Sequence, residues 1–284
     1  MKVRAVVSLK AEHRLAVLLQ AAGLARSTFF YHQARLQDPD PRAGLKAAIT
    51  EVFTKSYARY GHRRVHHELV RAGWQVAKKT VLMLMRQLRL ICRSRRKKRY
   101  VSYQGQTGRV APNLLDRDFT VGAPNQKWVT DVTEFRIGDD KLYLSPVMDL
   151  FDRQIIAYSL QTSPNLQLTN SSLRAALATL DDGAAPLVHS DQGFQYQHTS
   201  WRHLLTQAGA TQSMSRKGNC YDNAVIENFF GHLKEETFHH VRHLSLDALT
   251  TALHDYIHWY NNDRISTRLK GLSPVQYRTQ ALTA

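Results

Sequence analysis

The chain has 284 residues, a formal net charge of +16 at pH 7 and a hydrophobic content of 43%. This length predicts about two domains, at least one with a substantial core. No run of about 18 apolar residues occurs, which argues against a membrane span, and the basic N-terminus lacks the apolar stretch of a secretion signal. The two cysteines, Cys92 and Cys220, fit no CxxC pattern. We therefore expect no disulfide or zinc framework and a reducing cytoplasm as the location.

The positive charge is concentrated at one end of the chain. Residues 1–110 hold 24 Lys and Arg against 5 Asp and Glu, a net charge of +19, whereas residues 111–284 hold 15 against 18, a net charge of −3. This asymmetry predicts a nucleic-acid-binding region joined to a domain with another task. A basic surface that serves only solubility is the alternative.

Two segments of the basic region are predicted to form helix-turn-helix-like units, at 11–35 and 59–92. In the first, an apolar helix ends at Gly23 and a second helix follows, with Ser27 as its expected N-cap. Many helix pairs that do not bind DNA have this spacing, so DNA contact is one of two interpretations here.

The second unit leads into a strongly basic stretch. Its first helix is expected to turn Val65, Leu69 and Val70 inward. Residues 93–99, RSRRKKR, carry six positive side chains in seven, which cannot pack and must lie against solvent or phosphates. The DNA contacts predicted in this stretch are Arg93, Arg95, Arg96, Lys97, Lys98 and Arg99.

A change of composition separates this region from the rest of the chain. Residues 100–121 are polar with Gly and Pro, which predicts a linker between a basic helical region, 1–99, and a second domain, 122–284. That domain opens with three β-rich runs, KWVTDVTEFRI, KLYLSPVMDLF and QIIAYSLQT, typical of an antiparallel meander. Later strands alternate with helices, so we expect an α/β fold with a mixed sheet, preceded by an all-α region.

Three acidic side chains fall where buried residues are expected. Asp131 lies inside the first predicted strand, Asp191 follows the strand 188–190, and Glu227 lies between apolar pairs in the helix NAVIENFFGHLK, whose expected N-cap is Asp222. A carboxylate among apolar neighbours is costly unless something binds it. Carboxylates that converge form sites for Mg²⁺, and two such ions cleave phosphodiesters. Taken singly, each acid is also explained as a cap or a salt-bridge member.

The runs WVTDVTEF, HSDQG and SMSRKGNCYDNAVIENFFGHLKEE together resemble the DDE catalytic core of bacterial insertion-sequence transposases, and in particular their second-reading-frame (OrfB) proteins, relatives of retroviral integrases. That family has 35 residues between its second and third acids, as between Asp191 and Glu227, and a Lys or Arg seven positions later, as at Lys234. YGHRRVHHEL and YNNDRISTRLKGLSPVQYR resemble its helical region and C-terminal signature. The zinc-binding His/Cys cluster of integrases has no counterpart here.

The resemblance implies an RNase H-like core in which Asp131, Asp191 and Glu227 are catalytic and hold two Mg²⁺ ions, with Mn²⁺ able to substitute. It also implies an enzyme that cleaves DNA 3′ ends and transfers the strand, as in DNA integration and recombination. The further DNA contacts expected in this domain are Lys234, on the helix face of Glu227, and Arg216 and Lys217 on the preceding loop.

The expected partners follow from the same resemblance. They are double-stranded DNA, as element ends and as target, and further copies of the chain in a homo-oligomer on DNA. Functional family members are commonly frameshift fusions to a first-frame protein, and this chain, which starts at its own methionine, is expected to lack that partner. Two rival functions stay open: a structure-specific nuclease that cuts without joining, and a regulator that binds DNA or the fusion protein without cleavage.

Overall fold

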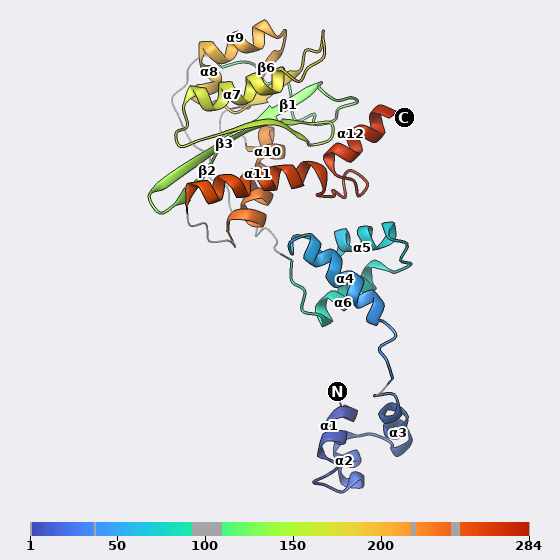
Figure 1. Ribbon diagram of the computed structural model, residues 1–284. Coiled ribbons are helices and arrows are strands. Elements are labelled where there is room, and N and C mark those ends of the chain that lie inside the picture. Colours follow the sequence, from blue (N-terminus) through green and yellow to red (C-terminus); the bar gives the residue numbers. More distant parts are fainter. Residues whose placement is uncertain (1, 37, 93–109, 217–219, 240–244, 284) are drawn as a thin grey trace. The chain divides into compact units, whose positions relative to one another are not determined.

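The chain divides into two compact units, Met1–Glu51 and Val52–Ala284, in a computed structural model that describes residues 2–36, 38–92, 110–216, 220–239 and 245–283 (Figure 1). This division differs from the predicted boundary at residue 99. The reason is that the segment before the helices of residues 62–87 is bonded to the C-terminal part of the chain, as described below.

The first unit is built on three helices, α1 (Lys2–Leu9), α2 (Leu15–Ala22) and α3 (Arg26–Ala34). Val6, Leu19 and Phe29 are buried together as its core. Gly23 ends α2 in the left-handed region at φ 61°, where glycine is favoured, and its N–H donates to the Gln20 carbonyl at 3.1 Å. The predicted helix pair is therefore present, but Ser27 lies in the first turn of α3 and is not its cap.

Helix α4 (Ala43–Lys55) crosses the division between the units, and α5 (His62–Arg71) and α6 (Lys78–Gln87) follow it in the second unit. Helix α5 buries Val65 and Leu69, one turn apart, against α6. The inward position predicted for Val70 is wrong, since its side chain is 50% exposed.

A short segment before α5 holds this helix pair to the C-terminal part of the chain. The hydroxyl of the buried Tyr60 donates to the Asp263 carbonyl at 3.1 Å and accepts from the Ile265 N–H at 2.9 Å. Beside it, the Arg59 guanidinium lies 4.5 Å from the ring centre of Trp259, a cation–π distance. These contacts join segments about two hundred positions apart, so α5 and α6 belong to the second unit.

The second unit is organised around a six-stranded mixed sheet. The long strand β3 pairs antiparallel with β1 and β2 along one edge and with β4 along the other, while β1, β5 and β6 run parallel. The strands are β1 (Lys127–Thr130), β2 (Thr133–Ile137), β3 (Asp140–Asp149), β4 (Ile155–Gln161), β5 (Leu187–Ser190) and β6 (Thr211–Met214).

The predicted meander is confirmed, with one correction to its first run. That run forms two strands, β1 and β2, separated by Asp131 and Val132, so Asp131 lies just beyond a strand end and not inside a strand. The physical reason is local: the Asp131 carboxylate accepts the N–H of Val132 at 2.7 Å and takes the place of a ladder partner.

Helices cover both faces of the sheet (Figure 1). Trp128 packs with α7 and α9 on one face, and its neighbour Val129 packs with α10 and α11 on the other, as the alternation of a strand requires. Both side chains are fully buried. The helices are α7 (Leu166–Leu177), α8 (Phe194–Gln197), α9 (Thr199–Gln207), α10 (Ala224–Leu233), α11 (Leu246–Asn262) and α12 (Pro274–Thr283).

The described part of the predicted linker, 110–121, packs on this domain. Leu115 is buried in the core formed with α10 and α11, and the N–H groups of Leu114 and Leu115 donate to the Ser213 hydroxyl at 2.9 and 3.2 Å. The apolar and hydrogen-bonded contacts thus make residues 110–121 part of the domain; 100–109 lie outside the described residues. No helix in the described ranges is long and apolar enough to cross a membrane.

Candidate active site

Two of the predicted acids follow neighbouring parallel strands. In the pairing of β1 with β5, Trp128 lies beside Val188 and Val129 beside His189. Extending this register by two residues places Asp131 beside Asp191, directly after the strands end. Both side chains are half-buried. The carboxyl ends of parallel strands are where α/β sheets place their functional groups.

The third acid, Glu227, comes from α10, which packs against β1. This helix buries Ile226, Phe229, Phe230 and Leu233 and leaves Glu227 half-buried. Its start is fixed to the end of β1, because the Asn223 side-chain amide donates to the Thr130 carbonyl at 3.3 Å. Glu227 therefore lies one turn beyond a direct link to the residue that precedes Asp131.

Electrostatics show that these groups lie close together. Burial raises the pKa of Asp131 well above its usual value, and the nearby Asp191 and Glu227 carboxylates raise it further, whereas Lys234 lowers it. Burial also raises the pKa of Asp191, against the effect of the Gly193 N–H, which donates to its Oδ1 at 2.9 Å. The structure thus brings together the three acids and Lys234 predicted from the sequence.

The donor set fits a divalent cation. Asp131 is unfavourable as an anion beside two other carboxylates, and a bound cation would remove that penalty. Carboxylate oxygens are the ligands that Mg²⁺ prefers. Within the described residues, no three His, Cys, Asp or Glu side chains are already arranged as ligands around a single metal position. The fit to a divalent cation therefore rests on the charge and the donor chemistry of the three acids.

The loop after Asp191 is packed around its carboxylate. A Cβ added at Gly193 would lie 3.0 Å from the Asp191 Oδ1 and 3.0 Å from the Gln195 Oε1, which is tighter than nine in ten real Cβ contacts. Behind the acids, Tyr196 is fully buried, and burial together with Asp131 and Asp191 raises the pKa of its hydroxyl well above the usual value. The sequence did not predict the roles of Gly193 and Tyr196 beside the acids, although a glycine directly after HSDQ is a signal for close backbone approach.

Asp222 does not cap α10, contrary to the prediction. The N-cap is Asn223, and Asp222 is buried as a hydrogen-bond acceptor for Arg216, Arg117 and Asn113, whose Nδ2 lies 2.9 Å from its Oδ2. Burial alone would raise the pKa of Asp222, but the bonds from Arg216 and Arg117 hold it well below the ordinary value of 3.8. Asp222 thus ties residues 113–117 to the loop that precedes α10.

An Asp222→Asn variant is expected to lower the free energy of unfolding by about 2 kcal/mol at pH 7, because two guanidiniums lose a charged acceptor. The folded-state pKa of Asp222 is depressed, so its stabilisation is complete above the ordinary value of 3.8 and is lost only as the pH falls from there through the lower folded-state pKa. Urea unfolding at pH 7 and pH 3 checks this: the difference between the wild type and the variant should be smaller at pH 3 than at pH 7 but should not vanish. An equal or larger difference at pH 3 would contradict the assignment.

His189 is a structural neighbour of the acids. Its imidazole bridges β5 and β6, with Nδ1 at 2.8 Å from the Ser213 hydroxyl and Nε2 at 3.0 Å from the Ser215 hydroxyl. Burial lowers the pKa of His189 to about 4, so the ring is neutral at pH 7. His189 thus holds β5, which precedes Asp191, to β6, which precedes the loop that leads to α10.

The predicted DNA contacts have different positions. Lys234 directly follows α10, with its ammonium 5.3 Å from the ring centre of Phe135 and within electrostatic reach of Asp131. Arg216 is held in ion pairs with Asp222, at 3.1 Å, and with Asp116, at 3.3 Å. The others lie outside the described residues: Lys217, Arg93, Arg95, Arg96, Lys97, Lys98 and Arg99.

Comparison with known families identifies both parts of the chain. The family "Integrase core domain" matches residues 122–220 and 227–282, and the family "HTH-like domain" matches residues 40–98, which include α4, α5 and α6. Together with the mixed sheet covered by helices, the integrase core matches confirm the RNase H-like fold class that the resemblance implied. The HTH-like match contains the second predicted helix unit, 59–92.

Relatives in bacterial insertion sequences match along almost the whole chain. InsK of insertion sequence element IS150 of Escherichia coli K12 is 47% identical over 93% of this chain and 93% of its own. The transposase InsF of IS3A, also from E. coli K12, is 33% identical over 96% of both chains. A protein of element IS1353 of Shigella flexneri is 42% identical over 98% of this chain, which spans 54% of that relative. The chain therefore belongs to the OrfB-type transposases of bacterial insertion sequences, whose catalytic part is an integrase core domain.

Proposed function

We propose that this protein cuts the 3′ ends of its insertion element and joins them to target DNA, with Asp131, Asp191 and Glu227 as its catalytic residues. The proposal is supported by the positions of these three carboxylates at the ends of β1 and β5 and on α10, where burial and then Asp191 and Glu227 raise the pKa of Asp131. Strongly perturbed carboxylates in one place are typical of active sites.

In this proposal the three acids hold divalent cations, Mg²⁺ or Mn²⁺. Two such ions, when bound, would activate the attacking oxygen and stabilise the leaving oxygen. The protein's own part is to fix the ligands: the Val132 N–H orients Asp131 at 2.7 Å, the Gly193 N–H orients Asp191 at 2.9 Å, and α10 carries Glu227. Lys234 offers a positive charge to a DNA phosphate beside them.

The reaction proceeds by two direct displacements at phosphorus. In the first, the oxygen of a water molecule bonds to the phosphorus at the element end, the bond from phosphorus to the 3′ oxygen breaks, and that oxygen leaves as a 3′-hydroxyl. In the second, this hydroxyl attacks a phosphodiester of the target strand and displaces the target's own 3′ oxygen. Neither step forms a bond to the enzyme, so no Ser or Tyr nucleophile is required.

The basic helical region supplies DNA binding in this proposal. Residues 1–110 carry a net charge of +19, and the HTH-like match at 40–98 covers helices of the kind that dock on DNA. We propose that the ends are held by this region while the acidic site, in a part of the chain with a net charge of −3, performs the chemistry.

A labelled duplex that carries the element end tests this function. Incubation with Mg²⁺ is expected to yield a 3′-nicked strand and then a longer, joined strand. Nicked strands without joined strands would indicate a nuclease, and DNA binding without either product would indicate a regulator.

A Gly193→Ala variant is expected to lower the cleavage rate several-fold without weakening DNA binding. Its added Cβ would lie 3.0 Å from the Asp191 Oδ1 and must shift that carboxylate by a few tenths of an ångström, less than the misplacement of about 1 Å that costs about a hundredfold. Single-turnover cleavage and DNA affinity are the two measurements. Gly122→Ala is the control, because a Cβ there meets no atom within 4 Å. Wild-type cleavage by Gly193→Ala would contradict the proposed place of Asp191.

A further inference from the structure

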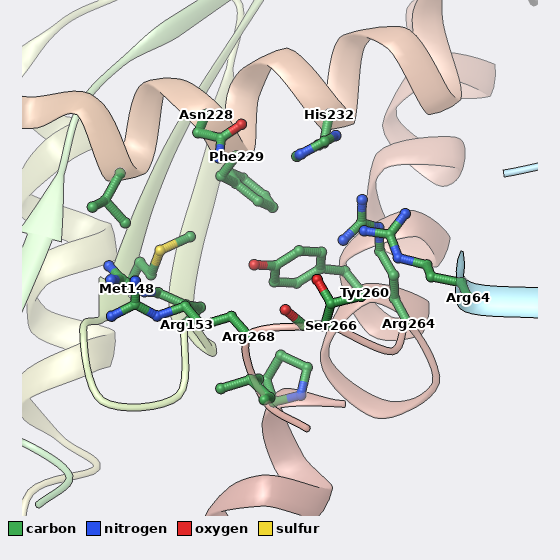
Figure 2. A pocket seen from close by; sticks show the side chains of 14 residues that line it. Arg64, Met148, Arg153, Asn228, Phe229, His232, Tyr260, Arg264, Ser266 and Arg268 are labelled. Atoms are coloured by element: carbon green, nitrogen blue, oxygen red, sulfur yellow. The ribbon is translucent and has the colours of Figure 1, made fainter. Parts of the chain in front are cut away.

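A cavity of about 310 Å³ lies beside α10 (Figure 2). Val225, Phe229 and His232, which recur at helical spacing, turn towards it. At 3.6 residues per turn, Glu227 lies on the opposite side of the helix. The cavity is therefore separate from the candidate active site, and its volume lies within the range of small-ligand sites.

Arginines dominate the charged lining of this cavity. Figure 2 shows Arg64 and Arg264 side by side at one end and Arg153 and Arg268 at the other, with Phe229 between them. They come from three separate parts of the chain, namely α5, the turn between β3 and β4, and the segment after α11. No Asp or Glu is among the described residues that line the cavity.

One carboxylate behind the wall pairs with this cluster. Glu236 accepts two hydrogen bonds from Arg264, at 2.9 and 2.6 Å, and a third from the Tyr256 hydroxyl at 2.9 Å. The negative charge of Glu236 also favours the charged form of the Arg64 guanidinium, but the Glu236 oxygens already accept hydrogen bonds from Arg264 and Tyr256. The Arg64–Arg264 end of the cavity thus has two guanidiniums for one carboxylate.

The other end of the cavity also has more guanidinium groups than carboxylates. Asp149 and Asp152 lie near Arg153, but both accept hydrogen bonds from Arg278. The Arg278 Nη2 lies 2.7 Å from the Asp149 Oδ2, and the Arg278 Nε donates to the Asp152 Oδ2. Arg268 adds a further, exposed cation. Among the described residues of these two clusters, five arginines (Arg64, Arg153, Arg264, Arg268 and Arg278) accompany three carboxylates (Asp149, Asp152 and Glu236), which leaves an excess of two positive charges.

Two of the arginines each have a buried N–H group without a hydrogen-bond acceptor among the described residues. The Arg64 Nε and the Arg153 Nη1 are buried and have no hydrogen-bond partner among the described residues. Burial lowers the pKa of both guanidiniums, that of Arg153 to about 10, and the neighbouring arginines, Arg264 and Arg268 respectively, lower them further. Buried cations without acceptors are costly, and a bound anion would offset that cost.

The backbone at Arg153 is also unusual. Its φ is 67°, in the left-handed region that a residue other than glycine rarely adopts. The conformation is fixed by the Arg153 N–H, which donates to the Asp149 carbonyl at 2.9 Å. The tight turn brings a long cationic side chain to the cavity, and strain of this kind is found at ligand sites.

We propose that this cavity binds a phosphate group, with Arg153 and Arg268 as its principal ligands. Guanidinium forks suit phosphate oxygens because they donate two parallel hydrogen bonds. A phosphodiester of a DNA strand is the source that accords with the proposed function, on which this part of the inference rests; a free phosphate compound has the same chemistry.

The test uses the full chain in EDTA, so that it is independent of metal-dependent cleavage. The probes are inorganic pyrophosphate, followed by thermal unfolding, and a fluorescent element-end duplex, followed by anisotropy at several salt concentrations. The test variant is Arg153→Asn with Arg268→Gln, since Asn tolerates the left-handed region and Arg268 is exposed. Arg174→Gln, an exposed arginine on α7, is the matched control, and Arg268→Lys keeps the charge.

Pyrophosphate is expected to raise the unfolding temperature of the wild type and of Arg174→Gln but not of the double variant. The double variant should bind the duplex about tenfold more weakly, with a salt slope flatter by about 1 because one phosphate contact is lost, while Arg268→Lys keeps the wild-type slope. If the double variant loses the stabilisation by pyrophosphate but binds the duplex like the wild type, the site binds a free phosphate compound. Wild-type responses of the double variant to both probes would overturn the proposal, whatever the cleavage assay shows.

Discussion

A Glu227→Gln variant is expected to lose 3′-end cleavage and strand transfer by about a thousandfold or more and to bind element-end DNA almost as tightly as the wild type. Glutamine keeps the size of the side chain but removes one of the charges that would balance the bound cations, a loss of several kcal/mol in the transition state. The basic region, which supplies the DNA affinity in our account, is untouched by this change.

The measurements are a single-turnover cleavage rate and a dissociation constant on the same labelled duplex. Glu134→Gln is the matched control, because Glu134 is exposed on β2 in the same domain and accepts hydrogen bonds from Lys141 and Tyr143 at the surface. The control should cleave at the wild-type rate. An equal loss of cleavage and of binding in Glu227→Gln would show that chemistry and DNA binding are not divided as we propose.

Replacing the six basic residues of 93–99 with Gln is expected to produce the largest change in DNA affinity. Each phosphate contact that is lost lowers the slope of log K against log salt by about 0.9, so six contacts would flatten it by about 5. Cleavage at saturating protein should be retained, since none of these residues belongs to the proposed catalytic set.

The salt dependence of duplex binding measures this effect directly. A charge-preserving variant, in which each Arg of 93–99 becomes Lys and each Lys becomes Arg, is the control and should keep the wild-type slope. If the neutral variant also keeps that slope, the principal DNA contacts lie elsewhere in the chain, and the predicted role of this stretch is wrong.

The sequence predicted the parts of the site that depend on local pattern. Strand-like and apolar runs located the two strands before Asp131 and Asp191, and the helix around Glu227 followed from its apolar spacing. Where local chemistry competed with the pattern, the prediction failed. Asp131 was expected inside a strand, but its carboxylate takes the Val132 N–H and separates β1 from β2.

Contacts between distant segments were not predictable in this way. Asp222 looked like a helix cap because it precedes α10, whereas its carboxylate serves Arg117 and Asn113, which come from more than a hundred positions earlier. The bonds of Tyr60 to the chain after α11 gave no sequence signal either. Such contacts place the division between the units at residue 51 and assemble the arginine-lined cavity from three parts of the chain.

The central claim is that Asp131, Asp191 and Glu227 act together, through bound divalent cations, on a DNA 3′ end. The most direct measurement compares the wild type and an Asp131→Asn variant on a labelled element-end duplex, each as the chain alone and as a first-frame fusion, in Mg²⁺, Mn²⁺ or EDTA. Our account predicts nicked and joined strands from the wild type with either cation, none in EDTA and none from the variant. Products in EDTA, or products from Asp131→Asn at the wild-type rate, would contradict it.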